Sequence, residues 1–164
     1  MAAPTKLYIF CCLLMAALFA YSASVQLNDP DWYFWFPLYA IACVVNLVNW
    51  AISSKRINQV AEAALWLGMF LFIKVVAEDY VSGVSGFWSL DLRKRVIREK
   101  IGSGLVIISM VLQLMASLST PEAPSQNRPN SVPRYVEYGM GILVGFSYGL
   151  PFVFFVVQKG ELKF

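Results

Sequence analysis

Two aspartates lie two positions apart in the polar segment between the first two apolar stretches, and they are the residues of this chain best suited to chemistry. Asp29 and Asp31 follow Asn28 and flank Pro30. Paired carboxylates can hold a cation or act as a general acid and a general base. The segment also suits a turn in which Asp29 caps the next helix and Pro30 occupies its first position. A third interpretation is that the segment binds a lipid headgroup or a partner protein.

The rest of the chain offers these carboxylates little help with catalysis. It has no histidine, the commonest general base near neutral pH and the commonest metal ligand. Its cysteines, Cys11, Cys12 and Cys43, lie inside apolar stretches and form no Cys-x-x-Cys pair, which is typical of small packing residues. We therefore expect a protein that is not an enzyme and has no catalytic, cofactor-binding or metal-binding residues.

Basic residues gather before the fourth apolar stretch. Arg93, Lys94 and Arg95 are followed by Arg98 and Lys100, and this run leads directly into apolar sequence, so we expect one continuous helix. Such clusters set the orientation of membrane proteins and attract anionic lipid headgroups. We expect the headgroups of anionic lipids to bind Arg93, Lys94 and Arg95. Nucleic acid is not an expected partner, because the apolar content is too high and no binding motif is present.

Two spanning segments separate the aspartates from this basic run, so both lie on the same face of the membrane. We predict a polar cluster there, in which the aspartates meet Arg98 or its basic neighbours and tie the first hairpin to the fourth helix. The members of the predicted cluster are Asn28, Asp29, Asp31, Arg98 and Glu99. Lys74, near the end of the third stretch, is expected to extend its ammonium to the headgroups.

Amide side chains lie inside two of the apolar stretches. Asn46 and Asn49 lie near one face of the second stretch, and Gln113 lies four residues from both Ser109 and Ser117 in the fourth. Hydrocarbon offers no hydrogen-bond partner, so these groups should face protein. Two interpretations remain open. Either the amides bond to one another and hold helices together, or they line a polar pocket or narrow pathway between the second and fourth helices.

Membrane-spanning helices are the elements that must position these residues. Hydrophobic residues make up 59% of the 164 residues and charged residues 14%, against roughly 45–50% and about 25% in soluble domains. A spanning helix needs roughly 20 apolar residues, and five stretches approach that length. They are Leu7–Val25, Phe36–Ile52, Val60–Ala77, Ile101–Leu118 and Tyr138–Val157. We predict an all-α membrane protein, a small bundle of about five transmembrane helices in a single domain over residues 1–164.

Two further features concern the end of the chain. Residues 119–137 are rich in proline and are expected to form a mobile loop. Gly141, Gly145 and Gly149 repeat at a spacing of four in the fifth stretch, which places three bare backbone patches on one helix face. We expect them to serve helix packing, either within the chain or, as the alternative, against a second copy.

Two groups of residues resemble the transmembrane protein 220 family. They are Gln26-x-Asn28-Asp29-Pro30-Asp31 followed by Trp35 and Tyr39, and Arg98-Glu99-Lys100-Ile101-Gly102 leading into an apolar stretch. The resemblance implies a small multi-pass membrane protein. It implies no particular activity, substrate or cofactor.

From these observations we expect an integral multi-pass membrane protein that binds lipid or another membrane protein, or forms a homo-oligomer, without enzymatic activity. The alternative is a small transporter or channel-like carrier that uses the polar stripe of Asn46, Asn49 and Gln113. An enzyme acting on lipids ranks third. A carrier predicts a water-accessible cavity that reaches these amides, whereas a binding component predicts amides bonded to one another or to the backbone.

Overall fold

The computed structural model of the chain describes residues 5–52, 55–82, 95–118 and 132–161, which form five helices. The helices are α1 (Lys6–Gln26), α2 (Trp32–Val48), α3 (Lys55–Ser82), α4 (Arg95–Leu118) and α5 (Arg134–Glu161). The described part of the chain contains no strand. The predicted all-α fold class is confirmed.

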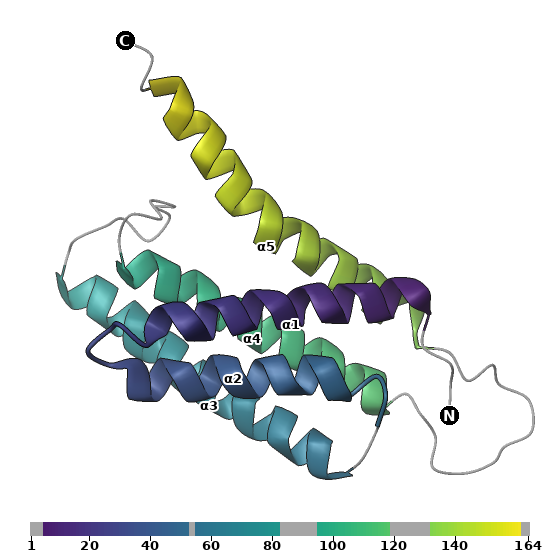
Figure 1. Cartoon of the computed structure of the whole chain (residues 1–164). Coiled ribbons are helices and arrows are strands. Elements are labelled where there is room, and N and C mark those ends of the chain that lie inside the picture. The colour runs from purple at the N-terminus through teal and green to yellow at the C-terminus, as the bar shows by residue number, and fades with distance from the viewer. Residues whose placement is uncertain (1–4, 53–54, 83–94, 119–131, 162–164) are drawn as a thin grey trace, which may run out of the picture.

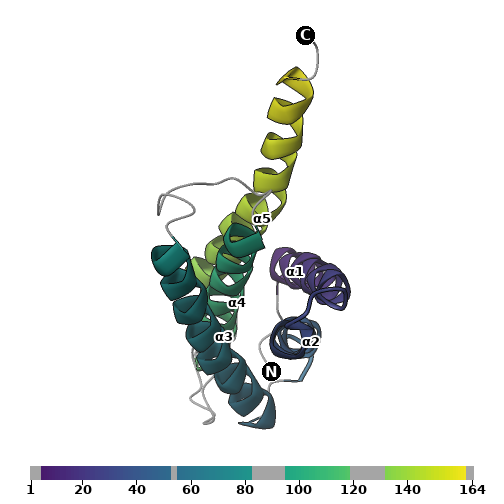
Figure 2. The same cartoon turned by 90° about the vertical axis from the view of Figure 1, so that its left-hand side faces the viewer.

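Helices α1 to α4 lie side by side and alternate in direction (Figure 1). The view turned by 90° shows α1 and α2 as one pair beside the pair of α3 and α4 (Figure 2). The pairs meet mainly through α2, which packs on both α3 and α4. We call the end of the bundle near Gln26 and Trp32 the ion-pair end, and the end near Lys6 and Val48 the amide end.

The helices have the length and surface that a bilayer requires. Four of them, α1, α3, α4 and α5, are long and apolar enough to cross a membrane. Helix α2 is apolar but has 17 residues, or about 26 Å, slightly less than a hydrocarbon layer of about 30 Å. Large apolar side chains cover the outside of the described helices, among them Phe10, Trp66, Phe70, Ile73 and Ile142. An exterior of this kind needs lipid around it.

Helix α2 begins earlier than the apolar stretch that predicted it. The stretch starts at Phe36, but the helix starts at Trp32, because the aromatic residues before Phe36 pack at helical spacing. The rings of Trp32 and Phe36 lie 6.4 Å apart, and those of Trp35 and Tyr39 lie 6.3 Å apart. Such pairs four residues apart stabilise a helix. Fully buried Trp35 and Tyr39 thereby stand on the face that meets α1 and α4.

Tyr39 brings α2 unusually close to α4. Its ring stacks on Phe19 of α1 with centroids 6.3 Å apart, and its hydroxyl lies against the bare backbone of Gly102. A Cβ atom at Gly102 would overlap that hydroxyl. The buried Glu99, one turn earlier on α4, is near enough to Tyr39 to interact with it electrostatically. The absence of a side chain at Gly102 therefore sets the distance between the two helices.

Helix α5 starts at the amide end, packs on α1 and α4, and then leaves the bundle (Figure 1). It begins at Arg134, so the last four residues of the predicted loop are helical, while residues 119–131 lie outside the described residues. Among the α5 glycines whose surroundings the structure describes, Gly139 meets a neighbour, the side chain of Leu112.

The glycine stripe of α5 does not pack as expected within the chain. A Cβ atom added at Gly141, Gly145 or Gly149 would meet no heavy atom of another described helix within 4 Å. The reason is that α5 turns another face to the bundle, the one that carries the buried residues Val136, Met140, Leu143 and Ser147. Spacing alone identified a face that can be approached closely, but not whether a helix of the same chain approaches it.

We predict that Gly102→Ala destabilises the protein by about 1–3 kcal/mol, because the added methyl group displaces the Tyr39 hydroxyl. The matched control Gly141→Ala should be neutral or stabilise by up to about 1 kcal/mol, since that site is open and alanine favours helix. Unfolding in mixed micelles by a denaturing detergent measures both. Adding Tyr39→Phe to Gly102→Ala should recover part of the loss, and equal effects of the two glycine substitutions would contradict the close contact.

Candidate functional site

Among the described residues, two polar clusters and a cavity are candidate functional features. At the amide end, the fully buried Gln113 of α4 is the centre of a hydrogen-bond network. Its Oε1 accepts from the Tyr8 hydroxyl and from Asn49 Nδ2, each at 2.8 Å. Its Nε2 donates to Asn46 Oδ1 at 2.9 Å and to Cys12 Sγ at 3.3 Å. One side chain thus joins α1, α2 and α4.

The two asparagines complete the network. Asn46 Nδ2 donates to the Ala42 carbonyl at 2.8 Å and to Ser109 Oγ at 3.0 Å. Asn49 Nδ2 also donates to the Gln113 carbonyl at 3.2 Å, and Asn49 Oδ1 accepts from Ser117 Oγ at 3.1 Å. Every amide oxygen and nitrogen of the predicted polar stripe therefore has a partner. This arrangement matches the interpretation in which the amides hold helices together.

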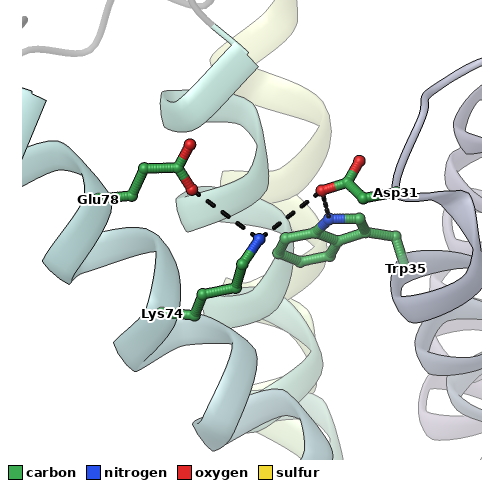
Figure 3. Close-up of polar contacts among 4 residues, drawn as sticks. All are labelled: Asp31, Trp35, Lys74 and Glu78. Carbon is green, nitrogen blue, oxygen red and sulfur yellow. Dashed lines mark hydrogen bonds and ion pairs between the residues drawn. The ribbon is translucent and has the colours of Figure 1, made fainter.

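At the ion-pair end, Asp31 contacts a residue of α3 and a residue of α2, the helix that it precedes. Its carboxylate accepts from Trp35 Nε1 at 3.2 Å and lies 3.8 Å from Lys74 Nζ of α3. Figure 3 shows the ammonium of Lys74 between the carboxylates of Asp31 and Glu78, the latter at 3.9 Å. The side chain of Asp31 is 17% exposed and that of Glu78 is 52% exposed. The contact with Asp31 is thus the better shielded of the two.

A second ion pair at this end joins α3 to α4. Lys100 Nζ lies 2.7 Å from Asp79 Oδ2, and the side chains are 15% and 5% exposed. Sequence reasoning missed Asp79, because it lies just beyond the third apolar stretch and no spacing pairs it with Lys100. It also assigned Lys74 to the headgroups, whereas the side chain reaches Asp31.

The predicted cluster of Asn28, Asp29, Asp31, Arg98 and Glu99 is divided in the structure. Asn28 is exposed, and Asp29 takes part in a turn in which its carbonyl accepts from Trp32 N at 3.2 Å. Glu99 is buried beside Tyr39, and Arg98 is exposed. Within the described residues no ion pair links Arg98 to Asp29 or Asp31. The cation that lies beside Asp31 is Lys74 of α3.

The expected helix cap by Asp29 is not formed. Helix α2 starts at Trp32 with Asp31 at the capping position, and the Asp31 side chain makes no capping hydrogen bond. Its carboxylate bonds to Trp35 instead.

Of the residues expected to contact anionic lipid, Arg93 and Lys94 lie outside the described residues, and Arg95 is the first residue of α4. Nor do the described residues contain a group of three or more potential metal ligands.

A cavity of about 400 Å³ lies where α5 separates from α1. The Tyr148 hydroxyl donates to the Leu14 carbonyl of α1 at 2.8 Å. Figure 1 shows that the C-terminal part of α5 leaves the bundle. The walls come from the second half of α1, the first half of α4 and the middle of α5, with Tyr39 from α2. Most of the lining is apolar. Gln26 and Arg98 are polar exceptions at the ion-pair end.

These features together define the class of the protein. Apolar helices of spanning length surround an interior in which Asn46, Asn49 and Gln113 are bonded to one another, which is the architecture of an integral multi-pass membrane protein. A family model described as "Transmembrane family 220, helix" matches residues 18–115. The match covers more than half of the chain, so the chain belongs to transmembrane family 220, as its motifs indicated. No solved structure matches the chain significantly.

We predict that Gln113→Leu lowers the free energy of unfolding by about 1–3 kcal/mol, because the Tyr8 hydroxyl and an Asn49 donor lose their shared acceptor. Gln59→Leu is the matched control. Gln59 is exposed on α3, and the same substitution there should change stability by less than about 0.5 kcal/mol. The measurement is unfolding in mixed micelles, and comparable losses in both variants would contradict the network.

We predict that Asp79→Asn destabilises the protein by about 3 kcal/mol, because it leaves the largely buried Lys100 ammonium without its carboxylate. The adjacent Glu78→Gln should cost less than about 0.5 kcal/mol, since that carboxylate is exposed. Adding Lys100→Met to Asp79→Asn should restore much of the stability. The measurement is thermal unfolding of the variants in detergent, followed by circular dichroism. A double variant no more stable than Asp79→Asn would contradict the ion pair of Asp79 with Lys100.

Proposed function

We propose that this protein is a non-enzymatic membrane component that binds lipid, and that the cavity between α1, α4 and α5 is the binding site. The observation that carries the proposal is the position of the cavity on an apolar bundle, between a helix that diverges and the two helices it leaves. Its volume of about 400 Å³ falls within the range of roughly 300–1,000 Å³ that ligand sites occupy.

The physical argument for lipid comes from packing. A void inside a protein leaves its lining atoms without partners on one side, and this loss of contact is costly. Within a bilayer the molecules at hand to fill an apolar void are lipid acyl chains. The cavity walls include Leu18, Val25, Leu105 and Leu150, side chains as apolar as hydrocarbon. An acyl chain is the filling that this lining favours.

The amide network supports this function over a carrier. A pathway along the stripe would need Asn46, Asn49 and Gln113 to offer free polar atoms to a solute or to water. Their amide groups are instead bonded to one another, to serines and to backbone carbonyls. Opening a pathway would require several of these bonds to break at once. The stripe therefore favours a role in holding α1, α2 and α4 together.

The test is whether lipid stays with the protein on purification. We expect native mass spectrometry of the full chain, extracted in a mild detergent, to show retained lipid. Leu105→Trp should remove it by filling the cavity, whereas Ile108→Trp should not, because Ile108 is on the exposed face of α4. Retained helicity and a monodisperse profile would establish that both variants fold. No lipid on the unmodified chain, or equal lipid on both variants, would refute the proposal.

A further inference from the structure

Arg98 is a cation at the edge of the apolar cavity. It lies four positions into α4, is exposed, and lines the cavity together with Ile101, Gly102 and Leu105 of the next two turns. No carboxylate neutralises it among the described residues, whereas Lys74 and Lys100 both have acidic partners there. An arginine guanidinium binds phosphate and carboxylate oxygens through two parallel hydrogen bonds. The cavity thus has an anion-binding group at one end.

Gln26 provides the second polar feature at the same end. It is the last residue of α1, and its side chain forms a hydrogen bond with Tyr39. Its Oε1 atom is buried and has no hydrogen-bond partner of its own among the described residues. A buried acceptor that lacks a donor is costly, and native proteins contain few of them. Gln26 also lines the cavity. A ligand with a hydroxyl group at this depth would give Oε1 the donor it lacks.

The rest of the cavity continues away from these two groups with a mostly apolar lining, in which Ser22 and Ser147 are small polar members. From Gln26 back to Leu18 on α1, and from Arg98 forward to Leu105 on α4, the lining extends seven or eight residues, or roughly 10 Å along the bundle. Phe146 and Leu150 of α5 form the facing wall. The polar groups therefore stand at the membrane-surface end and the apolar walls lie toward the bilayer centre, the polarity of a lipid molecule.

We propose that the cavity binds an anionic lipid that carries a free hydroxyl group close to its charge. Arg98 binds the anionic group, Gln26 Oε1 accepts the hydroxyl, and one acyl chain lies along Leu18, Leu105 and Leu150. This inference rests on the proposed function, since it names the class of lipid for that site. A zwitterionic choline lipid fits poorly, because its ammonium would approach Arg98 and it has no hydroxyl to donate.

The test compares headgroups on identical acyl chains, using the full chain in a neutral detergent with native mass spectrometry as the readout. The probes are phosphatidylglycerol, with charge and hydroxyl, phosphatidylethanol, with charge but no hydroxyl, phosphatidylcholine, and diacylglycerol, with hydroxyl but no charge. A fatty acid of the same chain length tests a carboxylate as the anion. We expect phosphatidylglycerol to bind most tightly.

Two substitutions test which residue contacts which part of the lipid headgroup. Arg98→Gln should weaken phosphatidylglycerol binding by about tenfold or more and leave phosphatidylcholine unchanged. Arg56→Gln is its control, because Arg56 is exposed on α3 at the amide end. Gln26→Leu should lower the preference for phosphatidylglycerol over phosphatidylethanol about fivefold or more while phosphatidylethanol affinity is maintained.

The outcomes separate this inference from the proposed function. If all headgroups bind equally, or if Arg98→Gln and Arg56→Gln have the same effect, the inference is overturned and lipid binding stands. Tightest binding of the fatty acid or of phosphatidylethanol overturns the role of the hydroxyl. If no probe binds to the unmodified chain, the proposed function fails as well.

Discussion

Hydrocarbon cannot hydrogen-bond, and the arrangement of this protein depends on that constraint. A side-chain amide exposed to acyl chains would lose its bonds to water without replacement. Asn46, Asn49 and Gln113 avoid this loss by bonding to one another across α2 and α4, and Tyr8 extends the network to α1. Each bond contributes modestly, on average about 0.6 kcal/mol in membrane helices. Their larger effect is on register, because any sliding of α4 along α2 would break several bonds together.

At the ion-pair end, salt bridges rather than amide hydrogen bonds hold the helices together. There α3 is held to α2 through Lys74 and Asp31, and to α4 through Asp79 and Lys100. Between the two ends, the contact of Tyr39 with Gly102 sets how near α2 and α4 approach. Helices α1 to α4 are thereby fixed at three levels along their length. Among the described residues, Glu137 of helix α5 bonds to Thr5, while Ser147 and Tyr148 bond to α1. The divergence of α5 from the bundle creates the cavity.

Much of this architecture could be predicted from the sequence, because the membrane limits the possibilities. Apolar length identified the helices, and the cost of an unbonded amide indicated that Asn46, Asn49 and Gln113 face protein. It left open whether they bond to one another or line a polar pathway. The partner of Asp31 could not be predicted in this way. Several basic residues lie on the same face of the membrane, and the choice among them depends on the crossing of α2 with α3. The direction of α5 and the face that it turns to the bundle could not be predicted either. The spacing of Gly141, Gly145 and Gly149 is the same whether or not a helix packs against them. The cavity, which depends on that direction, could not be foreseen either.

The most direct test of the bonded interior is a double-mutant cycle between Tyr8→Phe and Gln113→Leu. These side chains lie 105 positions apart, and a single hydrogen bond of 2.8 Å joins them. The account predicts that the double variant is more stable than the sum of the two single losses implies, by about 0.6–1.7 kcal/mol, because no buried hydroxyl then lacks its acceptor. Strictly additive losses would contradict it, since they would mean that Tyr8 and Gln113 do not interact in the folded protein.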